Sequence, residues 1–169
     1  MKNYLSNILI YIAALCGIIA FAGLFATPLM IQDTIKGTWS AYNVKAYIGE
    51  KAVFDSGTVQ IYKGTWFPIV GYVLPLLMSI FLIVESFKPS LDSKLAVINT
   101  VLAILYFFCA VSVLLTKELW LNVNNYEDVG IIRNGLGPIM SGILSFLAGV
   151  ILLIVTWMPG RKKIDYIEK

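Results

Sequence analysis

Four long stretches of the sequence contain no Asp, Glu, Lys or Arg. They cover residues 5–31, 66–84, 95–115 and 136–158. A helix of about 20 apolar residues is long enough to cross the hydrocarbon core of a bilayer, and each stretch is about that long or longer. Uncharged apolar stretches of this length are typical of membrane spans rather than of soluble domains. The sequence therefore predicts four transmembrane helices.

The composition agrees with this class of protein and narrows its chemistry. Hydrophobic residues make up 59% of the chain and charged residues 14%, which excludes a disordered tail and an ordinary soluble enzyme domain. There is no histidine, and the two cysteines, Cys16 and Cys109, lie inside predicted spans. We therefore predict no catalytic residue, no metal site, no cofactor and no disulfide in the exposed part. The net charge of +3 is too small to indicate a nucleic-acid partner.

The distribution of Lys and Arg predicts the orientation. Seven of these residues lie in three short segments: the start of the chain, the connection 85–94 and the tail 159–169. The other six are spread over the loops 32–65 and 117–135. Because the denser side is normally cytoplasmic, we expect a multi-pass protein of the cell membrane with both termini inside and these two loops outside.

The first outer loop has the pattern of a small β-sheet. Residues 43–48, 51–54 and 58–63 alternate or are strand-like, and turn residues separate them, which predicts a three-stranded antiparallel meander. Residues 119–123, from the second outer loop, could add one more strand to the same small sheet. The predicted fold is a membrane four-helix bundle, all-α in its spans, with a small extracytoplasmic antiparallel sheet, so the chain is α+β overall.

A sheet this small has exposed edges, which recruit other chains unless they are covered. We therefore expect a protein partner or further copies of the chain to contact the outer loop. The candidate contact residues are Tyr47, Phe54, Asp55, Gln60 and Tyr62. A second interpretation stays open: the aromatic residues among them could form the sheet's own core or rest on lipid headgroups.

The four tryptophans fall near the predicted membrane boundaries, where tryptophan is enriched. We expect interfacial anchors at Trp39, Trp66, Trp120 and Trp157.

Each span also carries small residues at helical spacing, which allow helices to approach closely in lipid. The candidate packing residues are Gly17, Ala20, Gly23, Gly71, Ser141, Ser145 and Gly149. The first and last helices of a four-helix bundle are normally neighbours. We therefore expect Gly17, Ala20 and Gly23 to contact Ser145 and Gly149.

Three classes of function remain possible at this point. The spans contain no Asp, Glu, Lys, Arg or His, which disfavours a proton-coupled carrier or an ion pathway. This absence favours a structural or interaction protein that is not an enzyme. A channel-forming or accessory subunit of a transport complex is the alternative, and a continuous polar path between the helices would support it. An enzyme would need an outer cluster such as Glu118, Glu127, Asp128 and Arg133, which is more simply a solvated loop.

The layout resembles the claudin and peripheral-myelin-protein class, whose members have four spans, cytoplasmic termini and a larger, strand-rich first outer loop. Trp39, shortly after the first span, lies roughly where the claudin loop has its first tryptophan. The rest of that signature, a Gly-Leu-Trp followed by two cysteines, is missing here, so no functional residue can be transferred. The resemblance implies lateral assembly and contacts made by the outer sheet.

Overall fold

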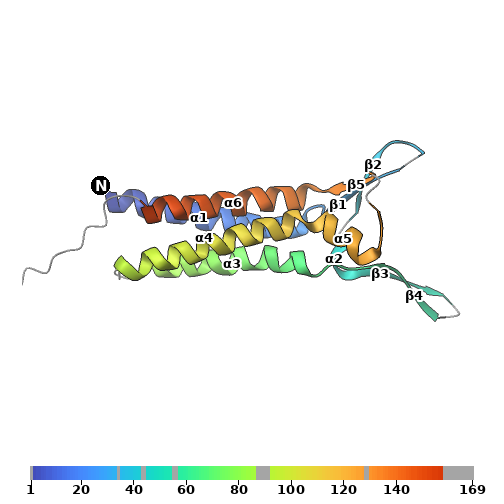
Figure 1. The fold of residues 1–169 in the computed structure, drawn as a ribbon, viewed down its shortest axis with the longest axis horizontal. Coiled ribbons are helices and arrows are strands. Elements are labelled where there is room, and N and C mark those ends of the chain that lie inside the picture. Colours follow the sequence, from blue (N-terminus) through green and yellow to red (C-terminus); the bar gives the residue numbers. More distant parts are fainter. Residues whose placement is uncertain are drawn as a thin grey trace, which may run out of the picture.

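A computed structural model describes residues 2–33, 35–42, 45–54, 57–86, 92–127 and 130–157. Four long helices lie side by side, and the strands gather beyond one end of them (Figure 1). These helices are α1 (Lys2–Ala22), α3 (Phe67–Ser86), α4 (Asp92–Leu114) and α6 (Leu136–Trp157). The start of α1 and the end of α6 lie at the opposite end from the strands.

All four helices are long and apolar enough to cross a membrane. The candidate spans are Leu5–Phe25, Phe67–Ser86, Ala96–Leu114 and Leu136–Trp157. The first of them includes η1 (Gly23–Phe25), one turn of 3-10 helix that follows α1. By length and composition, these helices support the prediction of a multi-pass membrane protein.

The first span ends earlier than the sequence predicts. We expected it to reach residue 31, but residues Leu29–Gln32 form strand β1. Pro28 explains the break, because a proline disfavours helical backbone in the residue before it and cannot donate the hydrogen bond of a helix interior. The apolar run continues through β1 because Leu29 is buried in a core outside the spans.

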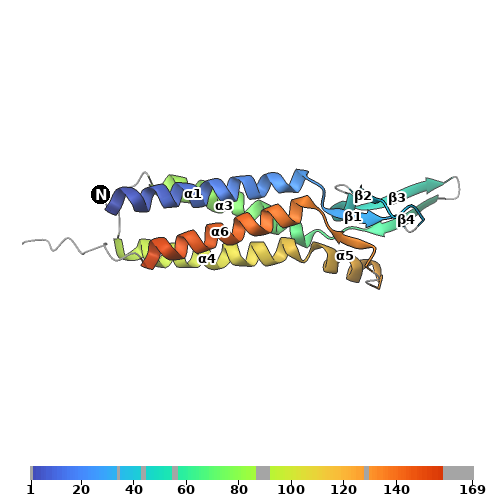
Figure 2. The same cartoon turned by 90° about the horizontal axis from the view of Figure 1, so that it is seen from above.

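The four helices pack as neighbours in the order α6, α1, α3, α4, with α4 also contacting α6 (Figure 2). Their interior holds a core of small and apolar side chains that includes Ala13, Ala103 and Leu152. Several polar side chains are also buried there, namely Ser79, Asn99, Ser112, Ser141 and Ser145. Large apolar side chains such as Leu77, Ile104 and Phe146 instead face outward. This distribution suits lipid as the surrounding solvent, since a water-soluble protein rarely exposes so much apolar surface.

The small antiparallel sheet that we predicted is present, but it is divided in two. One part has the order β2–β1–β5, with β2 at Trp39–Tyr42 and β5 at Ile132–Asn134. The other part is a hairpin of β3 (Gly49–Phe54) and β4 (Gly57–Lys63). The predicted strands 51–54 and 58–63 are therefore confirmed as this hairpin.

Two predicted strands are helical. The segment 43–48 was expected to be a strand, but Lys45–Ile48 form the short helix α2, and residues 43 and 44 lie outside the described residues. Residues 119–123 lie within α5 (Thr116–Asn124). Trp120 and Leu121 are both buried, so adjacent residues face the core here, whereas a half-buried strand would bury alternate ones. The second outer loop does add a strand, but the strand is β5.

The strands, α2 and α5 share their own core beyond one end of the spans and are tied to the spans. We call these elements the outer domain, after the two loops that are predicted to lie outside. Leu29, Ala46, Trp120, Leu121 and Ile132 bring together β1, α2, α5 and β5. In addition, the Asn134 side chain accepts a hydrogen bond from the Lys117 backbone N–H at 3.0 Å and donates one to the Leu114 carbonyl at 2.6 Å. These contacts fix the outer domain on the end of the four helices.

Candidate interaction surface

Four aromatic side chains join the separate outer elements at the base of the hairpin. Tyr42 of β2, Tyr62 of β4 and Trp120 of α5 pack with ring centroids 5.5–6.0 Å apart. Tyr126 stacks on Trp120 at 5.8 Å and also reaches the Tyr62 ring. We call these four residues the aromatic cluster. Trp120 is only 2% exposed, so the cluster is a packed core and not an open cage for a ligand.

A second set of contacts positions the hairpin through its backbone. The Asn124 side chain accepts a hydrogen bond from the Lys63 N–H at 2.8 Å and donates one to the Lys63 carbonyl at 3.1 Å. It thereby makes the two bonds that a neighbouring strand would make. Gly64 packs directly on the backbone of residues 47–49, where a Cβ would lie 2.2 Å from the Tyr47 carbonyl oxygen. The base of the hairpin is therefore held from two sides.

Charged and phenolic groups add a polar side to this base. Lys45 forms an ion pair with Glu50, and the Tyr42 hydroxyl donates to the other Glu50 oxygen at 3.3 Å. The hydrogen bond from Lys45 lowers the pKa of the Glu50 carboxyl. Burial, followed by the nearby Glu50 carboxylate, raises the pKa of Tyr42 to about 12. Tyr42 therefore stays protonated at neutral pH and remains a hydrogen-bond donor.

Tyr47 was predicted as an outer contact residue, but the structure places it in the junction between the outer domain and the spans. Its hydroxyl lies 2.8 Å from the Tyr72 hydroxyl, and its side chain is 2% exposed. Burial raises the pKa of Tyr47 to about 12. Tyr47 is thus unavailable to a partner, because it helps to seat α2 on α3.

The other predicted contact residues all belong to the hairpin region. Tyr62 is partly buried in the aromatic cluster. Phe54 and Gln60 are in β3 and β4, and the structure describes them by their backbone pairing alone: Phe54 with Gly57 and Gln60 with Lys51. Asp55 lies outside the described residues. Tyr62 therefore fits the second interpretation, in which the aromatic residues form the outer domain's own core.

The hairpin points away from the helices, roughly along their direction, and reaches somewhat farther than β1 and β2 (Figures 1 and 2). Its regular pairing runs from Lys51 opposite Gln60 to Phe54 opposite Gly57, and the register is irregular between Glu50 and Lys51. Within the described residues, β3 and β4 pair only with each other. The projecting part of the hairpin therefore presents two strand edges.

Two of the four predicted tryptophan anchors do not fit a membrane boundary. Trp120 is buried in the aromatic cluster. Trp39 lies in β2 opposite Gln32, at the end of the sheet away from the helices, and the Arg133 guanidinium stacks 3.9 Å from its ring centroid. Trp66 and Trp157 instead are 68% and 81% exposed, next to α3 and at the end of α6. The sequence showed how close the tryptophans are to the spans but not which ones are covered.

The predicted packing residues do lie between helices, but their observed neighbours are not the expected ones, since Gly17, Ala20 and Gly23 were expected to contact Ser145 and Gly149. Gly23 approaches Ser141 of α6, and the Ser141 hydroxyl donates to the Ala20 carbonyl at 2.6 Å. Gly17 instead lies against Ser79 and Tyr106, on α3 and α4.

Gly149 also differs from the expected contact, because it lies against Phe107 and Ala103 of α4 rather than against α1. Gly71 lies against Ser112 of α4, and the Ser145 side chain is fully buried. A helical stripe of small residues marks a close approach, but its angular position on the helix decides which neighbour is met.

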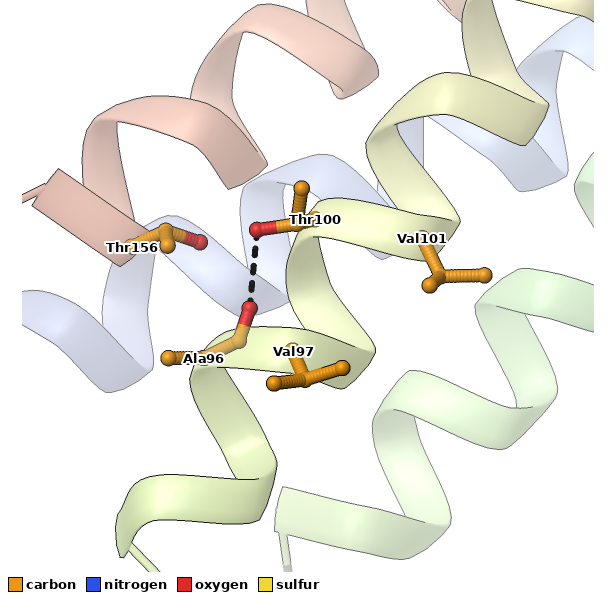
Figure 3. A pocket seen from close by; sticks show the side chains of 5 residues that line it. All are labelled: Ala96, Val97, Thr100, Val101 and Thr156. Atoms are coloured by element: carbon orange, nitrogen blue, oxygen red, sulfur yellow. Dashed lines mark hydrogen bonds between the residues drawn. The ribbon is translucent and has the colours of Figure 1, made fainter.

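An open groove of about 270 Å³ lies on the surface of the spans, between the start of α4 and the end of α6 (Figure 3). Its lining residues are Ala96, Val97, Thr100, Val101 and Thr156. The two threonine hydroxyls donate to carbonyls of their own helices, at 2.9 Å and 2.8 Å. The groove therefore offers mainly a hydrocarbon surface, as expected for a wall that faces lipid.

Among the described residues, no group of three or more Cys, Asp or Glu side chains lies close enough to hold a metal ion. The outer charges considered for an enzyme do not converge in the described part either: Arg133 stacks on Trp39, and Glu118 is exposed in the first turn of α5. Comparisons of the chain with protein-family models, curated proteins and solved structures found no match.

Proposed function

We propose that this chain is a non-enzymatic interaction protein of the cell membrane, which presents its outer β-rich domain to a partner protein or to further copies. The observation that carries the proposal is the β3–β4 hairpin, which projects away from the helices with two edges that pair with no third strand among the described residues. Strand edges are natural sites of β-strand addition.

The contacts at the base of the hairpin support the same proposal. A projecting two-stranded ribbon is only marginally stable alone, but the aromatic cluster and Asn124 hold its base. A preorganised strand loses less conformational entropy when a partner binds than a mobile loop does. This arrangement therefore favours recognition through backbone hydrogen bonds along the hairpin.

The orientation of the chain is part of the proposal. Both termini are cytoplasmic, and the strands lie outside the cell. Single cysteines at positions 63, 117, 88 and 163 test this orientation with a membrane-impermeant thiol reagent. We expect labelling at 63 and 117 in intact cells, and at 88 and 163 only after permeabilisation. Labelling at 88 in intact cells would reverse the topology.

A photo-crosslinking amino acid at position 60 tests the interaction itself. We expect adducts above the mass of the monomer when native membranes are irradiated, because position 60 lies in the regular part of the projecting hairpin. The same probe at Leu77, a residue on the outward face of α3, is the control for random encounters in the membrane. Monomer alone at position 60, together with solute flux in liposomes, would contradict the proposal.

A transport role is the second candidate, and one observation favours it. Among the described residues, three buried polar atoms between the helices have no hydrogen-bond partner: Asn99 Nδ2, Ser112 Oγ and Ser145 Oγ. Buried polar groups of this kind often bind water. Apolar residues such as Ala103, Cys109 and Leu152 fill the core among these polar side chains. This filling disfavours a continuous polar path and therefore supports the interaction role over the transport role.

A further inference from the structure

We infer that the partner of the hairpin is a second copy of this chain in the same membrane, with β4 of one copy paired antiparallel to β3 of the next. This inference rests on the proposed function, for which it names the partner. It follows from the directions of the two edges, from the orientation that a membrane imposes and from the register of the hairpin.

The two edges of the hairpin run in opposite directions. β3 leads away from the helices and β4 returns towards them, as both views show. Because the strands are paired over their length, their residues lie at matching heights above the ends of the helices. Each copy therefore presents one outgoing edge and one returning edge at the same height.

A membrane allows only some ways of joining these edges. Copies inserted in the same direction are related by rotation about the membrane normal, so a β4 edge placed beside a β3 edge of the next copy is antiparallel to it. Antiparallel pairing of two β4 edges would need a two-fold axis perpendicular to the strands, which would turn one copy upside down. Common orientation thus leaves β4-to-β3 as the antiparallel contact between copies. Parallel pairing of two β4 edges, about a two-fold axis along the membrane normal, is the arrangement that the test below distinguishes from it.

The residues at matching heights are compatible across this contact. If neighbouring copies keep the register of the hairpin, Gln60 faces Lys51, Val59 faces Ala52 and Thr58 faces Val53 of the next copy. No two like charges are opposed, and like charges directly opposite would destabilise a sheet. A shift by two residues would keep the same faces of the sheet together.

Asn124 marks where the contact begins. Its side-chain amide already bonds both backbone groups of Lys63 on the side of β4 away from β3. An incoming strand therefore pairs with the part of β4 beyond Lys63, towards Gly57. Since each copy has one edge of each kind, repetition of the contact produces a closed ring if the rotation closes and an open array if it does not.

Disulfide formation between differently tagged copies tests the inference. One copy carries Lys51→Cys, the other carries Gln60→Cys, and both are expressed in the same membranes and oxidised mildly. We expect a tag-1/tag-2 disulfide for this pair that exceeds, by several-fold, the disulfide between two Gln60→Cys copies. Gln60→Cys with Val53→Cys covers the shift by two residues, and the chain with only its native cysteines provides the background.

The outcomes separate this inference from the proposed function. Equal or stronger linkage between two Gln60→Cys copies would overturn the β4-to-β3 contact. If no pair of copies is linked, while the photo-crosslinker at position 60 captures a different protein, the inference fails and the proposed function stands. If neither method yields an adduct and the variants are present in the membrane fraction, both fail.

Discussion

Replacing Trp120 by Ala is expected to lower the free energy of unfolding of the outer domain by about 3–5 kcal/mol, the usual cost of truncating a buried tryptophan. The ring is 2% exposed and contacts Tyr42, Tyr62 and Tyr126. Its loss would leave β4 held to β2 by the Tyr42–Tyr62 contact and to α5 by Asn124 alone, and so would loosen the base of the hairpin. We therefore expect trypsin to cleave at Lys51 and Lys63 much faster in the variant, while the spans stay intact.

Trp66→Ala is the matched control, because it removes the same side chain from a site that is 68% exposed. Its indole makes a ring contact with Phe67 only among the described aromatic pairs, at 6.3 Å. We expect the tryptic pattern of this variant to match that of the unaltered chain. Equal destabilisation by the two substitutions would show that the aromatic cluster does not hold the hairpin.

The sequence predicted the elements whose signals are local. Four uncharged apolar runs are enough to predict four long helices, and the alternation at 58–63 is enough to predict β4. Both patterns come from residues that are neighbours along the chain and share one environment along one face.

The three-stranded sheet could not be predicted in the same way. It joins residues 29–32, 39–42 and 132–134, so its strands meet only after the helices have brought distant segments together. β1 is a short apolar run next to a span, and nothing in its composition separates it from that span. β5 is three residues long, below the length at which alternation is informative.

Sequence reasoning missed two asparagine side chains of the candidate site that connect separate elements by hydrogen bonds. Asn124 bonds two backbone groups of β4, and Asn134 bonds one of α4 and one of α5. The neighbouring sequence gives little sign of either set of bonds. A weak signal was present for Asn124, since Asn124-Asn125 follows a short periodic segment and Asn125 ends α5 with φ 55°. Asn is, after Gly, the usual residue at such a helix end.

Gly17→Leu is expected to prevent the normal packing of α1 against α3 and α4. Even a Cβ at this position would lie 2.2 Å from Ser79 Oγ, 2.5 Å from the Tyr106 hydroxyl and 2.9 Å from the Pro75 carbonyl oxygen. Ser79 and Tyr106 are bonded to each other at 2.9 Å, and Ser79 also donates to Pro75 O at 2.7 Å. These atoms cannot move apart without breaking buried hydrogen bonds, so we expect little folded protein in detergent.

A comparison of Gly17→Ala with Gly142→Ala isolates the free-energy cost of packing the new Cβ. Both substitutions gain the same helix propensity, about 1 kcal/mol. At Gly142 the three atoms nearest to the new Cβ all belong to the Leu114 side chain, from 2.6 Å. That side chain is 40% exposed and can rotate outward. Since overpacking costs about 1–3 kcal/mol, Gly17→Ala should unfold at lower denaturant than Gly142→Ala. Identical unfolding midpoints would mean that α1 does not approach α3 and α4 this closely.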